Sequence, residues 1–190
     1  MLNDRSTPLA LLETRRSGRP RDMVAPGPSA DELRRILKVA ARTPDHGKLA
    51  PWRFVHVPRE RRGDFAALLR GAFGESNPDA RAPELEAVDR LAAQAPELVV
   101  ALFSPKPSAK IPEWEQELSC GAAIMNLQHA AHALGYTAGW ITGWAAYSGT
   151  VRDAFGGPHE RIAGFIFLGT PGMPLEERVR PDLTQVVSRW

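Results

Sequence analysis

From residue 118 to residue 151 the chain contains no Asp, Glu, Lys or Arg. A membrane-spanning helix needs about 20 predominantly apolar residues in a row. This stretch instead contains Asn126 and two histidines, and it is interrupted by Gly135, Gly139 and Gly143. We therefore interpret it as a deeply buried helix, a glycine turn and a buried strand, and we expect no membrane span.

The rest of the chain alternates helix and strand signals without an obvious linker. Ser29 and Glu32 form a capping box that starts a helix, and Pro44 ends it near Thr43. The uninterrupted apolar run over residues 98–103 predicts a central strand that is buried on both faces. A polar loop is expected over residues 74–83. The predicted helices cover residues 8–16, 29–43, 59–73, 84–95 and 112–135, and the predicted strands cover residues 52–57, 98–103, 136–142 and 162–168.

A chain of 190 residues is long enough for one domain with a substantial core, and we expect a single domain over residues 1–190. With 24 basic and 22 acidic residues, the net charge of +2 does not favour nucleic acid as the main partner. Cys120 is the single cysteine, which excludes an internal disulfide and is typical of a reducing compartment. The N-terminus has no apolar run that would indicate a signal peptide. These features predict a cytoplasmic protein.

Three guanidinium groups and a hydroxyl lie at the end of the first predicted helix and just beyond it, in the run Arg15-Arg16-Ser17-Gly18-Arg19. Bidentate arginines and short hydroxyl donors are suited to a phosphate dianion. Basic residues at a helix C-terminus also complement the helix dipole without binding anything. The Ser-Gly pair beyond the helix favours the phosphate site, and Arg42, near the end of the next helix, is a further candidate.

A turn over residues 44–51 contains a lone histidine, His46, between a proline and a glycine and leads into the strand that starts at Trp52. A histidine in a loop is usually a solvated surface residue, but these neighbours indicate that its position is fixed. A second glycine-rich stretch, residues 139–143, would let backbone N–H groups approach an aromatic ring system closely. A tight bend in a buried strand is the alternative interpretation of those glycines.

Other arrangements point to structure more than to chemistry. His129 and His132 share a helix face, but no cysteine or paired carboxylate lies at a spacing that would complete a metal site, so we expect core histidines. Cys120 is predicted to be buried and inert. No nucleophile elbow or dinucleotide fingerprint occurs.

Taken together, these motifs resemble those of the small, single-domain members of the FMN-dependent nitroreductase family. The resemblance rests on the Arg-Arg-Ser run at residues 15–17, the Pro-Asp-His turn at residues 44–46 and the Pro-Trp-x-Phe run at residues 51–54, and it extends to residues 114–117 and 164–171. It implies an α+β fold with a mixed, mainly antiparallel sheet flanked by helices. It also implies that a long central helix lies at a homodimer interface, with the flavin between the subunits.

The resemblance further implies an oxidoreductase that binds FMN and uses NAD(P)H to reduce nitroaromatic, quinone or related acceptors by two-electron ping-pong transfer. The chemistry would take place on FMN, so we expect no catalytic side chain and no metal. The residues expected to bind FMN are Arg15, Arg16, Ser17, Arg19, Arg42, His46, Leu49, Trp140, Ile141, Thr142 and Gly143.

At one position the chain departs from the family pattern. Members of this subgroup tend to have Trp-Arg-Ser where this chain has Trp140, Ile141 and Thr142, so a cation near the flavin is absent. A non-catalytic FMN carrier or redox-responsive module therefore stays open as an alternative. A third, weaker alternative is a basic interaction module that uses the arginines of residues 15–21 and 59–62. The C-terminal tail is too apolar at its tip to be free, which is a further indication of a dimer.

Overall fold

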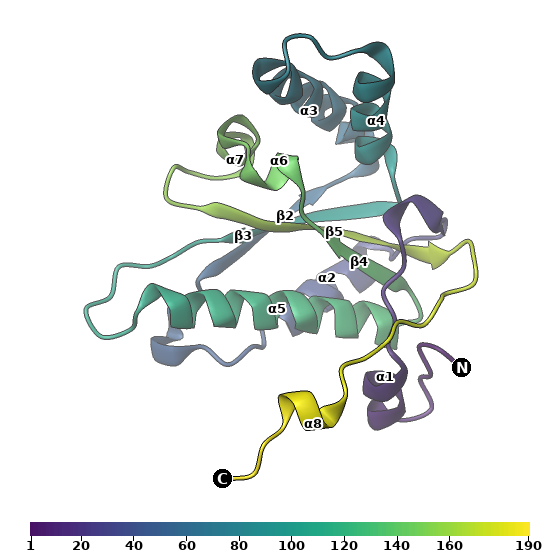
Figure 1. Ribbon diagram of the computed structural model, residues 1–190, viewed down its shortest axis with the longest axis vertical. Helices are drawn as coiled ribbons and strands as arrows, with labels where there is room; N and C mark the ends of the chain where they lie inside the picture. Colours follow the sequence, from purple (N-terminus) through teal and green to yellow (C-terminus); the bar gives the residue numbers. More distant parts are fainter.

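A five-stranded sheet forms the centre of the computed structural model, which describes all 190 residues. The strand order is β1-β5-β3-β2, and β4 also pairs with β5 (Figure 1). The α+β class is confirmed, but every pairing within the chain is antiparallel, so the expected mixed sheet is wrong for the single chain. The strands are β1 (Met23–Val24), β2 (Trp52–Val57), β3 (Glu97–Phe103), β4 (Thr137–Ile141) and β5 (Arg161–Pro171).

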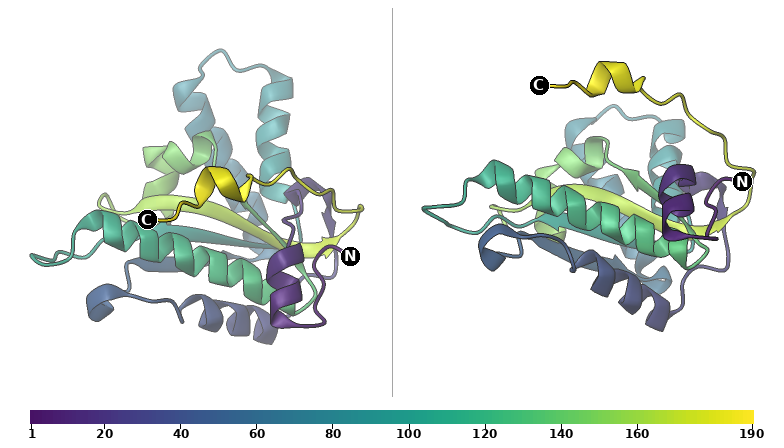
Figure 2. Two further views of the ribbon diagram at one scale, coloured as in Figure 1. Left: turned by 60° about the horizontal axis from the view of Figure 1, so that its bottom comes forward. Right: turned by 90° about the horizontal axis from the view of Figure 1, so that it is seen from below.

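Helices cover both faces of this sheet. One face is covered by α5 and α2, and the other by α3, α4, α6 and α7 (Figures 1 and 2). The α-helices are α1 (Pro8–Thr14), α2 (Ala30–Ala40), α3 (Arg62–Ser76), α4 (Ala82–Ala93), α5 (Glu113–Ala133), α6 (Trp144–Tyr147), α7 (Gly149–Phe155) and α8 (Leu183–Val186). Short 3-10 helices are η1 (Pro20–Asp22), η2 (His46–Lys48) and η3 (Arg59–Arg61).

Strand β3 is buried on both faces, as predicted from its apolar run. Leu98, Val100 and Leu102 belong to the core under α3 and α6, while Val99 and Ala101 belong to the core under α2 and α5. Successive side chains of a strand point to opposite faces. A continuous apolar run therefore supplies both cores at once.

Local signals set the limits of α2. The Ser29 hydroxyl accepts a hydrogen bond from the Glu32 N–H, and the Glu32 carboxylate accepts one from the Ser29 N–H at 2.9 Å. This capping box was predicted from the sequence. The helix ends at Ala40, a little before the predicted limit at Thr43.

The uncharged stretch contains a helix, a glycine turn and a strand, as predicted, but two further helices follow the strand. Helix α5 runs to Ala133, Gly135 turns the chain with φ of +97°, and β4 begins at Thr137. The short helices α6 and α7, which begin within the same stretch, were not predicted. None of the helices combines the length and the hydropathy that crossing a bilayer requires.

The loop expected over residues 74–83 is shorter than predicted. Helix α3 continues to Ser76, and α4 begins at Ala82. The side chain of Glu84 accepts a hydrogen bond from the Arg81 N–H at 2.9 Å and fixes the start of α4. Glycines at positions 71 and 74 did not stop α3, because tertiary packing overrides helix propensity.

The C-terminal tail leaves the body of the molecule after β5. Residues 173–180, here called the strap, run past the segment that follows α1, and α8 then stands away from the body (Figure 2). The side chains at its tip are exposed: Leu183, Val186, Val187 and Trp190. Within one chain this apolar tip has no cover.

Candidate functional site

Residues 15–19, the arginine segment, run along β4. Helix α1 ends at Thr14, slightly earlier than predicted, and the Gly18 N–H then donates to the Ala138 carbonyl at 3.2 Å. A Cβ atom on Gly18 would lie only 2.8 Å from Thr137 Oγ1. Glycine at this position therefore allows the segment to lie directly against β4.

The side chains of Arg15 and Ser17 lie toward the C-terminal half of α5. Ser17 Oγ donates to Gln128 Oε1 at 3.5 Å. The Arg15 side chain is half-buried, its Nε has no hydrogen-bond partner, and its charge acts on His129 and His132. An unpaired buried N–H on a cation is unfavourable, so this group is available for an acceptor from a ligand.

Arg16 and Arg19 instead contact the strap. Arg16 Nε donates to the Glu176 carbonyl at 2.6 Å, and Arg19 pairs with the Glu176 carboxylate at 3.0 Å. Our expectation was that Arg15, Ser17 and Arg19 converge on one point. In the structure Ser17 contacts α5, while Arg16 and Arg19 contact Glu176 of the strap, so Arg15, Ser17 and Arg19 do not converge on one point.

The strap brings further arginines to this place that the sequence analysis missed. Arg180 donates to the Arg15 carbonyl at 3.4 Å. Burial lowers the pKa of Arg15 below its usual value, and the charges of Arg180 and Arg16 lower it further. Burial and the charges of Arg178 and Arg180 have the same effect on the pKa of Arg16. Crowded cations of this kind fit a multivalent anion, and the alternation Arg178-Val179-Arg180 was the available sequence signal.

A cavity of about 400 Å³ lies between the arginine segment, β4 and the strap. Arg16, Ser17 and Arg19 line it together with Thr137. The Thr137 side chain is fully buried, and its Oγ1 has no hydrogen-bond partner. Two carboxylates, Asp22 and Glu176, also line the cavity, and Glu176 pairs with Arg19. Cavities of this size hold small organic ligands, and the arginines and hydroxyls of this one supply donors for an anionic group.

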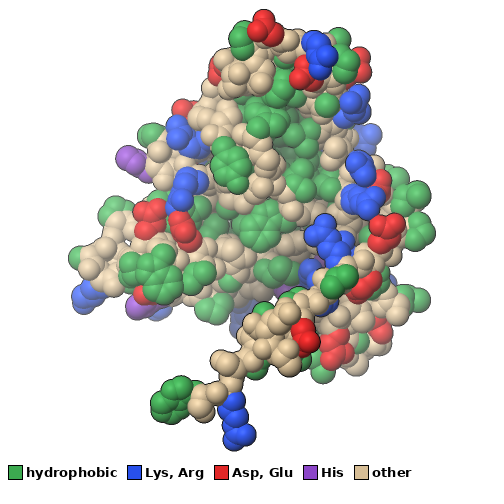
Figure 3. Space-filling model, viewed as in Figure 1, with side chains coloured by type: hydrophobic (Ala, Val, Ile, Leu, Met, Phe, Trp, Pro, Cys, Tyr) green, Lys and Arg blue, Asp and Glu red, His purple; other side chains and the backbone are tan.

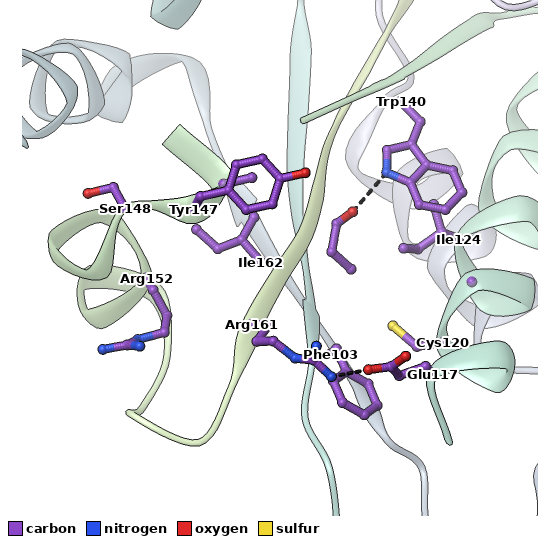
Figure 4. A pocket seen from close by; sticks show the side chains of 13 residues that line it. Phe103, Glu117, Cys120, Ile124, Trp140, Tyr147, Ser148, Arg152, Arg161 and Ile162 are labelled. Atoms are coloured by element: carbon purple, nitrogen blue, oxygen red, sulfur yellow. Dashed lines mark hydrogen bonds and ion pairs between the residues drawn. The ribbon is translucent and has the colours of Figure 1, made fainter. Parts of the chain in front are cut away.

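A second cavity, of about 450 Å³, lies between α5, the start of β5 and the α6–α7 pair (Figure 4). Its walls are largely apolar and include Phe103, Ile124 and Trp140. The Trp140 Nε1–H donates to the Ala163 carbonyl at 2.9 Å, so the indole presents its ring to the cavity and not its donor. Arg161 pairs with Glu113 and Glu117 at the rim.

The end of β4 provides the other predicted binding residues. Ile141 makes the last pairing with β5, at Phe165, and packs against the core on the α6 side. Thr142 and Gly143 lie beyond the pairing and are exposed, and Gly143 has φ of +95° at the start of α6. The structure therefore places Trp140 and Ile141 on the same strand as the arginine segment's partner, Ala138, and places Thr142 and Gly143 directly after that strand.

The histidine turn lies at the other end of α5. His46 Nδ1 contacts Glu115 Oε2 at 2.8 Å, and Ser119 Oγ donates to the Pro44 carbonyl at 3.1 Å. From Glu115 to Gln128, which contacts Ser17, the helix rises by about 20 Å. Within one chain His46 and Leu49 of this turn therefore do not join the arginine segment. Arg42 lies nearer to it along α5, since Asn126 Nδ2 donates to the Oγ1 of the adjacent Thr43 at 2.7 Å.

The remaining titratable candidates have structural roles. Cys120 is buried, and burial raises the pKa of its thiol to about 12, so it is inert as predicted. His132 is fully buried, and its Nε2 accepts a hydrogen bond from the Ala138 N–H at 3.2 Å. The expectation of core histidines is confirmed for His132.

Sequence comparison places this architecture among known proteins. Residues 12–170 match the sequence profile of the Nitroreductase family. A protein of Escherichia coli strain K12, provisionally named NAD(P)H nitroreductase YdjA, is 34% identical over 186 residues, which are 95% of this chain and 97% of the relative.

Solved structures share the fold at lower identity. A nitroreductase-like protein of Bacillus cereus superposes with a TM-score of 0.85 at 20% identity, covering 97% of this chain and 96% of the other. A nitroreductase of Bacteroides fragilis with bound FMN has a TM-score of 0.72 at 23% identity, covering 96% and 98%. A family match over most of the chain and a relative of nearly equal length agree, and the chain belongs to the nitroreductase family.

Proposed function

We propose that this protein is an FMN-dependent oxidoreductase that uses NAD(P)H to reduce a small oxidised acceptor, such as a nitroaromatic compound or a quinone, in a two-electron ping-pong cycle. Family membership and the NAD(P)H nitroreductase name of the Escherichia coli relative support this reaction class. FMN supplies the hydride and two-electron chemistry when bound, and the protein supplies binding, orientation and electrostatics. This division of labour explains why the sequence needs no catalytic dyad.

The observation that carries the proposal is the cationic arginine segment with its unpaired donor. Arg15 Nε and Thr137 Oγ1 are both buried without a partner, and Arg16 and Arg180 lie close to Arg15. A phosphate group would accept hydrogen bonds from such donors and would reduce the repulsion between the guanidiniums. We assign Arg15, Ser17 and Arg180 to the phosphate, with Arg16 and Arg19 beside them.

The end of β4 would hold the flavin ring system of FMN. Thr142 and Gly143 lie beyond the last pairing with β5, so their backbone is free to approach a planar ligand. Backbone N–H groups fixed in this way stabilise negative charge that develops on a bound group. Trp140 and Ile141 contribute shape, because the Trp140 donor is already bonded and Ile141 packs into the core.

A two-fold axis between two subunits would bring the histidine turn of one subunit to the flavin site of the other. If two α5 helices pack antiparallel across their midpoints, the start of one helix lies beside the end of the other. His46, which contacts the start of α5, would then reach the partner's arginine segment, which contacts the end of α5. We therefore assign Arg42, His46 and Leu49 to the flavin site of the partner subunit.

The exposed face of α5 supports this homodimer. Trp114 and Leu118 are 61% and 64% exposed, and Ala122, Met125 and Ala133 continue the same face at helical spacing. Figure 3 shows apolar side chains on this side of the molecule and at the isolated tip of the tail. An uncharged, apolar helix face of this length is typical of a buried interface.

A cytoplasmic location is part of the proposal. Its support is the single, buried cysteine, which is typical of proteins in a reducing compartment.

The absorption spectrum of the purified protein tests the proposal. We expect a yellow protein with about one FMN per subunit, as the site residues of each chain imply. NADH or NADPH should bleach the colour within seconds, and an added quinone or nitroaromatic compound should restore it. A colourless protein that gains no flavin on titration with FMN would overturn the proposal.

A non-catalytic flavin carrier is the second candidate, and Ile141 is the observation that favours it. Its side chain packs into the core, at the position where the family resemblance leads us to expect an arginine. A carrier would be yellow but would not be bleached by either nucleotide. The same spectrum therefore distinguishes the enzyme from the carrier.

A further inference from the structure

The buried side-chain atoms that lack a hydrogen-bond partner all lie in one region. They are Arg15 Nε, His129 Nδ1, His132 Nδ1 and Thr137 Oγ1. These residues belong to the arginine segment, the end of α5 and the start of β4. Buried polar atoms in native proteins are nearly always paired, so this concentration marks a region that packing alone does not explain.

His132 is at the centre of this region and joins its parts. The ring is fully buried, and Nε2 accepts a hydrogen bond from the Ala138 N–H at 3.2 Å. The carbonyl of the same residue, Ala138, accepts a hydrogen bond from the Gly18 N–H at 3.2 Å. One residue of β4 thus connects the imidazole to the arginine segment.

This arrangement requires a neutral imidazole. Nε2 can accept a hydrogen bond only when it carries no proton, which places the ring proton on Nδ1. The ionisable groups whose charges act on the ring are Arg15, from the arginine segment, and His129, from α5 itself. From β4 the ring accepts the Ala138 N–H, and no carboxylate is among the groups whose charges act on it.

We propose that His132 is a positioning residue for the phosphate of the cofactor, because it holds Ala138 and, through Ala138, the arginine segment in the conformation that receives a phosphate. The inference rests on the proposed function. Loss of the acceptor leaves the Ala138 N–H unpaired in a buried place, and β4 and the arginine segment are then free to shift. A site that is already held in its binding conformation has a higher affinity, because less conformational entropy is lost when the ligand binds.

Two substitutions separate the acceptor role from simple packing. His132→Gln keeps an acceptor near the position of Nε2 but cannot become charged, whereas His132→Leu keeps the volume and removes the acceptor. His129→Gln is the matched control, since His129 lies one turn earlier on α5 and does not bond β4. Dissociation constants for FMN and for riboflavin, which lacks the phosphate, are measured by flavin fluorescence near neutral pH.

We expect His132→Leu to weaken FMN binding about ten-fold, which corresponds to one unsatisfied buried N–H. Riboflavin binding should change little, and His132→Gln and His129→Gln should both resemble the wild type. Equal weakening for FMN and riboflavin would show a general structural defect and would overturn the inference. Unchanged FMN binding by His132→Leu would overturn it as well.

A pH profile gives a second measurement that does not depend on His132→Leu folding. As the pH falls toward the pKa of His132, wild-type protein should lose its preference for FMN over riboflavin more steeply than His132→Gln does. The phosphate of a phosphomonoester itself titrates near about pH 6, but that change is common to both proteins. Identical profiles for the wild type and His132→Gln would refute the role of His132.

These outcomes are distinct from failure of the proposed function. A wild-type protein that binds neither flavin overturns the flavin assignment and this inference with it. A wild-type protein that binds both flavins, with variants that do not discriminate between them, overturns this inference alone.

Discussion

Arg15 shows how one residue combines burial, charge and an unfilled hydrogen bond. Its side chain is half-buried, its Nε has no partner, and its nearest charged neighbours include Arg16 and Arg180. In the absence of an anion, each of these features is unfavourable. They are mutually consistent if the residue evolved to hold a phosphate.

Replacing Arg15 with Ala should therefore weaken FMN binding by about 1.5–3 kcal/mol, the range for a hydrogen bond to a charged group. The loss for riboflavin should be much smaller, because riboflavin lacks the phosphate. Titration of both flavins by fluorescence measures the two affinities. Arg34→Ala, which removes an exposed arginine on α2, is the control for the change in net charge. Equal losses for the two flavins would show that Arg15 acts through the fold.

His132 makes the stability of the fold depend on pH. Burial, followed by the charges of Arg15 and His129, lowers its pKa from 6.5 to about 4. Between these values the unfolded chain binds more protons than the folded chain, so the free energy of unfolding falls as the pH falls. The loss of stability is absent above about pH 6.5 and reaches about 3 kcal/mol by about pH 4.

His132→Gln should remove this part of the pH dependence. Denaturant unfolding at a series of pH values, for wild type and variant, compares the two slopes. If the free energy of unfolding depends on pH in the same way for the wild type and for His132→Gln between about pH 4 and pH 6.5, the assignment of this titration to His132 is contradicted.

At the scale of elements, local signals were sufficient wherever they were strong. The capping box at Ser29 predicted α2, the apolar run predicted β3, and the long uncharged stretch predicted α5, each nearly to the ends of the element. These local signals did not predict whether neighbouring strands run parallel or antiparallel. A continuous apolar run is common in parallel sheets, yet β3 is antiparallel to both neighbours and is buried because helices cover both faces.

Helix α5 carries the prediction that belongs to this scale. Leu118 is exposed in the single chain, so Leu118→Glu should alter the stability of a monomer by no more than about 0.5 kcal/mol. In the proposed dimer the new carboxylate would be buried without a partner. The dimer dissociation constant should then rise by at least about 100-fold.

Light scattering over a range of protein concentrations measures this change. Ala67→Glu, which adds the same charge at an exposed position of α3, should leave the mass unchanged. A Leu118→Glu protein with the same mass as the wild type at every concentration would place the dimer interface elsewhere.

At the scale of the whole molecule, the tail and α5 leave apolar surface uncovered. The tip of the tail stands away from the body, while the strap contacts the arginine segment (Figure 2). A second subunit would cover both the exposed face of α5 and the tip. That residues 1–190 act as one domain stays a prediction, although both cores share β3 and β5.

Deleting residues 183–190 should weaken the dimer and loosen a flavin site built from both chains. Folded monomers of obligate dimers are often unstable, so flavin release and unfolding of the truncated chain should depend on protein concentration. Light scattering gives the mass, and flavin fluorescence gives the release. The full-length Arg189→Ser variant, which keeps the apolar tip, is the control. A full-length protein that is monomeric at micromolar concentration and still retains FMN would defeat the dimer hypothesis.

The sequence by itself determined the features that depend on neighbouring residues. The start of α2 at Ser29, the two-sided burial of β3 and the arginine run after α1 follow from local spacing and capping chemistry. The expected flavin residues were named from the resemblance that the short motifs carry to the nitroreductase family, and they stay a prediction.

Only the tertiary structure decided how those residues meet. It directed Arg15 and Ser17 to α5 and Arg16 and Arg19 to the strap, and it kept His46 at the far end of α5. It also brought Arg180 from the tail to Arg15 and joined His132 to Gly18 through Ala138. These relations connect residues that are distant in the chain, so they depend on strand pairing and helix packing, which local sequence patterns do not specify.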